Sequence, residues 1–134
     1  MPRIAIDHIA IVVSDMDAAL GFWQQALGLE LGRIESIPSE EVDVAFLETE
    51  NAHVELLLPT SEDSGIARYL ATRGPGMHHL CLAVTDIEAA MRGLDAAGIE
   101  LINERPRQRG DGTRYAFVHP KSSGGVLVEL YEKA

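Results

Sequence analysis

The sequence predicts an α+β fold built from two equivalent β-α-β-β-β modules that pack against each other. The main observation is an internal repeat, because residues 7–20 (DHIAIVVSDMDAAL) align without a gap on residues 78–91 (HHLCLAVTDIEAAM). In both copies a short apolar run leads directly into a pattern with helical spacing. Two long repeats favour two equivalent modules, since a solenoid needs three or more short ones.

The repeat continues through the rest of each module. Three further pairs of segments match: ALGLEL with AAGIEL (26–31 and 96–101), VAFLE with YAFVH (44–48 and 115–119), and HVELLLP with LVELYEK (53–59 and 127–133). A length of 134 residues with 46% hydrophobic residues suits one compact domain. We therefore predict a single domain, with module one at about 5–58, a linker at 59–76 and module two at about 77–132.

Each module is predicted to contain a strand, a helix and then three more strands. In module one these elements fall at 8–13, about 15–27, 29–36, 42–48 and 52–58. In module two they fall at 79–84, 86–97, 100–103, 113–118 and 126–131. The linker begins with PTSEDSG and ends with GPG, and IARYLATRG between them is compatible with a short helix.

The helix boundaries follow from polar and glycine residues. SDMD and TDIE stand at the two helix starts, and the spacing from Thr85 to Glu88 is that of a capping box. Gly28 and Gly98 stand where each helix should end, at a position that favours a left-handed residue.

Composition excludes several classes of function. A net charge of −10 argues against nucleic-acid binding, which depends on cationic contacts with phosphate. No apolar run approaches the ~20 residues of a membrane span, and MPRIAIDHIAIVV lacks the pattern of a signal peptide. The single cysteine, Cys81, rules out an internal disulfide framework and is expected to be a buried, inert thiol. We expect a cytoplasmic protein without a membrane or nucleic-acid partner.

Two pairs of polar residues recur inside the apolar strands. His8 matches His79 in the first strand of each module, and Glu55 matches Glu129 in the last strand. If first and last strands line one concave sheet, the four side chains converge. Two imidazoles and two carboxylates suit a divalent first-row metal and leave two octahedral positions open.

The other histidines lack such a match. His78 should face away from His79 because neighbouring strand residues point to opposite faces. His53 precedes Glu55 by two positions on the same strand face, but its repeat partner is Leu127, so we expect a neighbour of the site. His119 is expected in a turn.

The whole chain resembles the vicinal oxygen chelate superfamily and, within it, the methylmalonyl-CoA epimerases. The resemblance rests on IDHIAIVVSDMDAALGFWQQALGLEL, HVELLLP, GMHHLCLAVTDIEAAM and above all RYAFVHPKSSGGVLVEL. It implies a cupped barrel, usually a homodimer, with His8, Glu55, His79 and Glu129 at the four metal-ligand positions. It also implies one divalent ion per chain, with Co²⁺ favoured and Mn²⁺, Ni²⁺, Zn²⁺ or Mg²⁺ as alternatives.

The resemblance implies epimerisation of (R)- and (S)-methylmalonyl-CoA by removal and return of the C2 proton through a metal-stabilised enolate. Such a reaction needs a proton-transfer group on each face. Glu129 is the first candidate. The second lies in the loop IPSEEVDVAFL, where Ser39 aligns with the usual glutamate and Glu41 replaces the usual glycine. A one-residue shift lets Glu40 serve, and Glu41 or no equivalent base are the alternatives.

Positive residues near the end of the chain are candidates for the acyl-CoA substrate. Lys121, in HPKSSGG, and Arg107 are the candidates to contact its phosphates, and the neighbouring arginines 105, 109 and 114 could meet phosphates as well. The alternative enzyme is a lactoylglutathione lyase of the glyoxalase I type, which shares the four-ligand metal. A dioxygenase is disfavoured because its facial triad keeps three protein ligands. The alternative from another class is a metal-free binding or resistance protein of the same fold.

Overall fold

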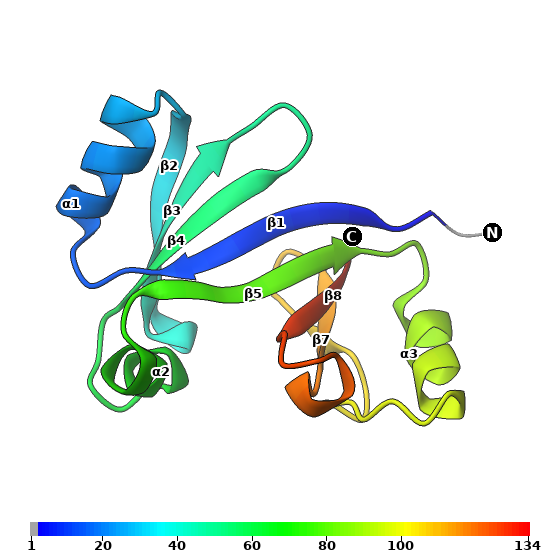
Figure 1. The fold of residues 1–134 in the computed structure, drawn as a ribbon. Coiled ribbons are helices and arrows are strands. Elements are labelled where there is room, and N and C mark those ends of the chain that lie inside the picture. The colour runs from blue at the N-terminus through cyan, green and yellow to red at the C-terminus, as the bar shows by residue number, and fades with distance from the viewer. Residues whose placement is uncertain (1–2) are drawn as a thin grey trace. The chain divides into compact units, whose positions relative to one another are not determined.

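The computed structural model describes residues 3–134 and divides into two compact units (Figure 1). The N-terminal unit is His8–His78, and the C-terminal unit combines the residues up to Asp7 with His79–Ala134. Both units contain helices and a mostly antiparallel set of strands that includes one parallel pair, which confirms the predicted α+β class.

The N-terminal unit contains the four strands predicted for module one. Its elements are β1 (Ala5–Val12), α1 (Met16–Leu20), η1 (Gly21–Ala26), β2 (Glu30–Ile37), η2 (Pro38–Glu40), β3 (Val42–Glu48), β4 (His53–Pro59) and α2 (Gly65–Arg73), with the first residues of β1 belonging to the other unit. The strand order is β2-β3-β4-β1. β2, β3 and β4 are antiparallel neighbours, whereas β1 runs parallel to β4.

The C-terminal unit repeats this arrangement. Its elements are β5 (Gly76–Ala83), α3 (Ile87–Ala96), β6 (Arg107–Gln108), β7 (Arg114–Val118), η3 (Pro120–Ser122) and β8 (Val128–Glu132), with the first residues of β5 belonging to the other unit. The strand order is β5-β8-β7-β6, and β5 runs parallel to β8. In each unit the first and last strands are therefore direct neighbours.

Strand alternation divides the core of the N-terminal unit between two faces. Ala10, Val12, Val44 and Leu57 pack together with Ile66, Tyr69 and Leu70 of α2. Ala45, Leu47 and Leu56 point the other way and pack with Leu20, Trp23 and other residues of the α1–η1 segment. His8, Ala10 and Val12 are spaced two residues apart along β1, so their side chains point to the same face. His8 therefore lies on the face that α2 partly covers.

One helix covers one face of the C-terminal unit. Ile87 and Met91 of α3 pack on Ala116, Val118 and Leu130 of β7 and β8, where Figure 1 shows the helix beside these strands. Residues Phe117 and Glu129 alternate with this set and therefore lie on the opposite face. Because α3 packs on one face of β7 and β8, the opposite face is the one that carries Glu129 and its neighbour His79.

The equivalent helices α1 and α3 begin at matching aspartates. Asp15 and Asp86 accept hydrogen bonds from the backbone N–H groups of Ala18 and Ala89, at 3.0 Å in both cases. The predicted capping box that begins at Thr85 is therefore wrong by one residue, because the Asp86 carboxylate takes the N-cap position. Gly28 and Gly98 have φ angles of +93° and +80°, which confirms the left-handed residue expected after each helix.

Two predicted elements differ from the structure. The helix expected at 15–27 changes after Leu20 into a π-helical turn, in which Leu27 N–H donates to the Phe22 carbonyl. The strand expected at 100–103 is reduced to a single bridge from Leu101 to Val118. The Asn103 side chain accepts the hydrogen bond of Phe117 N–H at 2.8 Å, so the backbone ladder ends there. The edge strand is instead the two-residue β6.

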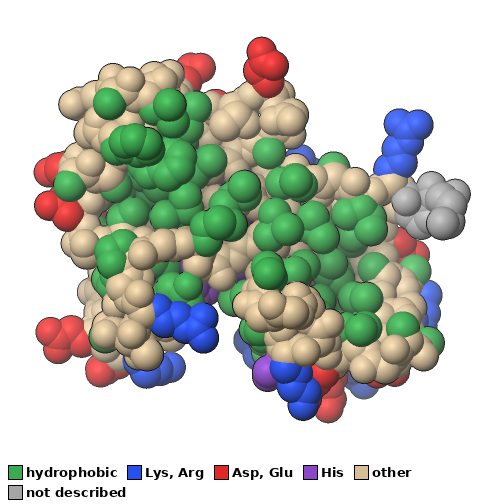
Figure 2. Space-filling model, viewed as in Figure 1, with side chains coloured by type: hydrophobic (Ala, Val, Ile, Leu, Met, Phe, Trp, Pro, Cys, Tyr) green, Lys and Arg blue, Asp and Glu red, His purple; other side chains and the backbone are tan. Residues whose placement is uncertain are grey.

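Hydrophobic side chains also reach the surface of both units (Figure 2). Exposed large hydrophobic residues include Phe22 and Leu27 in the N-terminal unit and Ile4, Ile102 and Val126 in the C-terminal unit. Within residues 3–134, no helix has both the length and the apolar character needed to cross a membrane.

Candidate metal centre

The first predicted ligand pair lies on the parallel strands β1 and β4. The register places Ala10 opposite Glu55 and His8 opposite His53. His8 Nδ1 is 3.1 Å from Glu55 Oε2, and the His8 side chain is only 7% exposed. Strand pairing therefore brings these two residues together, although 47 positions separate them in the chain.

His53 joins this pair. Its Nε2 lies 2.8 Å from the same Glu55 oxygen, and its ring centroid is 5.1 Å from that of His8. One ligand atom from each of His8, His53 and Glu55 falls within a 4.8 Å cluster, which could hold a metal ion. The repeat gave no signal for His53, since its partner is Leu127. The available signal was its spacing of two residues from Glu55.

The second predicted pair lies on the equivalent parallel strands β5 and β8. Cys81 pairs with Glu129, as Ala10 pairs with Glu55 in the other unit. His79 Nε2 lies 3.2 Å from Glu129 Oε1. Glu129 is 1% exposed, so its carboxylate is among the most buried polar groups of the described chain.

Arg109 contacts the other oxygen of Glu129. Its Nη2 donates to Glu129 Oε2 at 3.3 Å, and its guanidinium carbon lies 4.0 Å from the centroid of the Tyr115 ring. The sequence indicates Arg109 only as one of several loop arginines that are candidates for phosphate and gives no signal for this contact. Besides the histidine of the first strand, the carboxylate thus contacts His53 in one unit and Arg109 in the other.

The chemistry of these donors fits a divalent metal ion. Each unit presents an imidazole nitrogen beside a buried or nearly buried carboxylate oxygen, and these are the ligand types that first-row divalent ions take. A buried carboxylate is stable only when a positive or hydrogen-bonding group compensates it. The equivalent pairs His8–Glu55 and His79–Glu129 therefore satisfy the requirement on residue type.

The loop predicted to hold the second base forms a short 3₁₀ turn. Ser39 and Glu40 lie in η2 and are exposed, and Glu41 follows with φ +53°. Among the described residues other than glycine, Glu41 is the one with positive φ. Glu41 therefore adopts a left-handed backbone, which a residue with a side chain enters only at a steric cost.

The remaining residues named from the sequence lie outside these contacts, two at the surface, one in a turn and His78 partly buried in β5. Lys121 is 70% exposed in η3, with Nζ 3.4 Å from a Glu100 oxygen, and Arg107 is exposed in β6. His119 caps η3, because its Nδ1 accepts a hydrogen bond from Lys121 N–H. The His78 ring packs edge-on against Tyr69 of α2, with centroids 4.8 Å apart.

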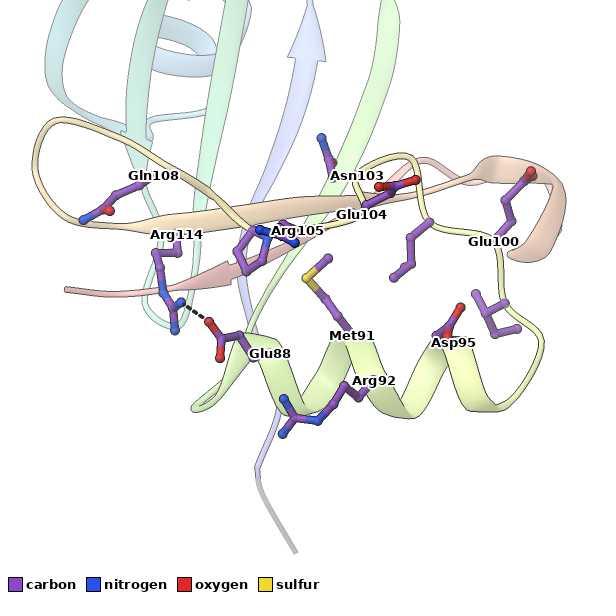
Figure 3. Close-up of a pocket in the computed structure, with 13 residues that line it drawn as sticks. Glu88, Met91, Arg92, Asp95, Glu100, Asn103, Glu104, Arg105, Gln108 and Arg114 are labelled. Carbon is purple, nitrogen blue, oxygen red and sulfur yellow. Dashed lines mark hydrogen bonds and ion pairs between the residues drawn. The ribbon is translucent and has the colours of Figure 1, made fainter.

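A cavity of about 830 Å³ lies elsewhere in the C-terminal unit, between α3 and the segment that follows it (Figure 3). Arg105 and Arg114 line it, and Figure 3 shows Arg114 bonded to Glu88. Neither His79 nor Glu129 is among the lining residues. Arg109 therefore contacts Glu129, whereas Arg114, the first residue of β7, lies beside α3.

Comparison with known proteins identifies the family. Residues 7–117 match the Glyoxalase/Bleomycin resistance protein/Dioxygenase superfamily. The chain belongs to this superfamily. An ethylmalonyl-CoA/methylmalonyl-CoA epimerase from Cereibacter sphaeroides is 38% identical over 127 residues, covering 93% of this chain and 95% of the relative.

Solved structures of superfamily members agree with the fold. Methylmalonyl-CoA epimerase from Mycobacterium tuberculosis has a TM-score of 0.87 and 36% identity, covering 97% of this chain and 88% of the other. A Streptomyces coelicolor methylmalonyl-CoA epimerase variant in complex with 2-nitronate-propionyl-CoA has a TM-score of 0.87 and 33% identity, covering 97% of both chains. The predicted superfamily and its fold are confirmed.

Proposed function

We propose that this chain is a metal-dependent methylmalonyl-CoA epimerase that removes and returns the proton at C2. The observation that carries the proposal is the duplicated imidazole–carboxylate contact, His8–Glu55 and His79–Glu129, in a chain whose relatives are named as epimerases. The structural relative in complex with 2-nitronate-propionyl-CoA supports an acyl-CoA thioester as the substrate class.

We propose that His8, Glu55, His79 and Glu129 hold one divalent ion, with Co²⁺ favoured. The support is chemical and comes from the repeat, since both units offer the same two donor types at equivalent strand positions. When bound, a divalent ion stabilises the negative charge that develops on the thioester oxygen as the C2 proton leaves.

Two carboxylates are proposed to carry the proton. Glu129 is proposed for one face because it is a buried carboxylate on the last strand, beside His79 and the proposed ion. Glu40 is proposed for the other face because it lies in the exposed turn before β3. Proton transfer by a positioned group contributes about 10²- to 10⁴-fold to such reactions.

The CoA phosphates are proposed to contact Lys121 and Arg107. Both side chains are exposed, and phosphate is bound by cationic donors. Exposed apolar side chains such as Phe22, Leu27 and Val126 support a homodimer. A cytoplasmic location is proposed because Cys81 is the single cysteine of the sequence, so the chain forms no internal disulfide and needs no oxidising compartment.

The test is proton exchange at C2, followed by NMR in D₂O with Co²⁺-loaded protein and methylmalonyl-CoA. The proposal predicts loss of the C2 proton signal and interconversion of the two configurations. A parallel sample receives the glutathione hemithioacetal of methylglyoxal. Turnover of the hemithioacetal without C2 exchange would contradict the epimerase activity and show that the chain is a lactoylglutathione lyase.

A further inference from the structure

We infer that Arg109 is a positioning residue, which holds one oxygen of Glu129 and leaves the other oxygen for a divalent ion. The two carboxylate oxygens have different neighbours: Oε1 lies 3.2 Å from His79 Nε2, and Oε2 accepts a hydrogen bond from Arg109. The inference rests on the proposed metal site and adds to it the way in which Glu129 binds the ion.

Two aromatic rings support this division. Tyr115 and Phe117 are two residues apart in β7 and therefore point to the same face. In the pairing of β7 with β8, Phe117 lies directly opposite Glu129. The Arg109 guanidinium lies over Tyr115, and the His79 ring packs edge-on against Phe117 with centroids 5.7 Å apart. The rings therefore fix the groups on both sides of the carboxylate, with cation–π attraction holding the guanidinium.

The backbone that carries Arg109 is also fixed. Arg109 N–H donates to the Thr113 carbonyl at 2.8 Å, and Gly112 N–H donates back to the Arg109 carbonyl at 3.0 Å. Inside this turn the Asp111 carboxylate accepts hydrogen bonds from the Thr113 N–H and hydroxyl. The Asp111 carboxylate thus forms its hydrogen bonds within the turn. The Arg109 guanidinium forms its hydrogen bond with Glu129.

The other unit shows what the arrangement would be without an arginine. There both His8 Nδ1 and His53 Nε2 approach the same oxygen of Glu55, Oε2. In the C-terminal unit Arg109 separates the two oxygens, and a guanidinium keeps its charge at all working pH values. Glu129 should therefore bind an ion through Oε1 alone, which preserves coordination positions for a substrate.

The test compares wild type with Arg109→Gln after loading with Co²⁺, whose visible absorption reports the number and geometry of its ligands. Glutamine cannot supply the charged donor, so Glu129 becomes free to turn both oxygens toward the ion. We expect one Co²⁺ per chain, a changed absorption spectrum, and a kcat lowered by about 10- to 100-fold, as for other outer-shell partners of metal ligands. KM should change less than kcat, because the substrate contacts remain.

Two conservative variants and one control complete the experiment. Arg109→Lys should restore part of the spectrum and of kcat, and Tyr115→Leu should shift both in the direction of Arg109→Gln by a smaller amount. If Arg109→Gln does not fold, Arg109→Lys and Tyr115→Leu still test the inference. The control is Arg33→Gln, because Arg33 also stacks on an aromatic ring, Phe46, and pairs with a carboxylate, Glu35, that is no predicted ligand.

The outcomes separate the inference from the proposed function. A wild-type spectrum and kcat in the Arg109 and Tyr115 variants would overturn the role of Arg109 while leaving the epimerase intact. Binding of Co²⁺ without C2 exchange in the wild type would contradict the epimerase alone, since the spectra still test Arg109. Failure of the wild type to bind Co²⁺ would overturn both.

Discussion

His79 Nε2 lies 3.2 Å from Glu129 Oε1, although 50 positions separate the two residues in the chain. The contact follows from the parallel pairing of β5 with β8, which places Cys81 opposite Glu129 and His79 on the same face two residues earlier. The N-terminal unit makes the equivalent contact between His8 and Glu55 through β1 and β4. Duplication of the strand pair therefore duplicates the imidazole–carboxylate contact.

Replacement of Glu129 by glutamine tests its role as a proton carrier. Glutamine keeps the shape but cannot accept a proton, so we expect C2 exchange to fall by about 10²- to 10⁴-fold. The measurement is the exchange rate in D₂O, with metal content determined on the same sample. Glu35→Gln removes an exposed carboxylate of the N-terminal unit and should leave exchange unchanged. Exchange at the wild-type rate in Glu129→Gln would exclude Glu129 as a base.

The second base is tested by parallel substitutions in the η2 turn. Glu40→Gln should lower C2 exchange by about 10²-fold or more if it carries the second proton. Glu41→Gln and Ser39→Ala should each retain most of the rate. A large loss in Glu41→Gln with none in Glu40→Gln would move the role to Glu41. Full activity in all three variants would show that the loop supplies no base.

The left-handed backbone at Glu41 has a measurable steric cost. Glu41→Gly relieves this cost, and we expect the free energy of unfolding to rise by about 1 kcal/mol. Glu40→Gly is the matched substitution at a position without positive φ, and it should lower stability by about 0.5–1 kcal/mol. Urea denaturation at neutral pH gives both values. Destabilisation by Glu41→Gly would contradict the left-handed geometry.

Glu132 makes stability depend on pH on the acid side. The hydrogen bond from Ile87 N–H, followed by the bond from Arg114, lowers the pKa of the Glu132 carboxyl below its usual value. A carboxyl whose pKa is lower in the folded state stabilises the protein above its unfolded pKa, and this contribution disappears as pH falls through the folded pKa. Glu132→Gln should therefore be less stable than wild type at pH 7, and the difference should shrink toward pH 3. A difference that stays constant over this range would contradict the ion pair.

The repeat revealed those features that both modules share. His8, Glu55, His79 and Glu129 could be selected because polar residues at matching positions in apolar strands have a common cause. Arg109 could not be selected, because it lies in a loop whose turn brings it back over Tyr115. Its contact with Glu129 depends on tertiary packing alone.

The fold differed from prediction where a side chain replaced a backbone interaction. The run at 100–103 has the composition of a strand, but the Asn103 amide oxygen takes the N–H of Phe117 and Pro106 has no N–H to continue the ladder. At the start of α3, Asp86 and Thr85 are both good caps, and the structure uses the aspartate that matches Asp15. The repeat was thus a better guide to this boundary than the local capping pattern.

The central claim is that the duplicated pairs of the two modules hold a single ion. Its most direct measurement is metal content, determined by elemental analysis of wild type, His8→Ala and His79→Ala after Co²⁺ loading and removal of excess metal. The account predicts one ion per wild-type chain and its loss in both variants, because each removes a ligand of the same ion. Two ions in the wild type, or full metal content in either variant, would contradict it.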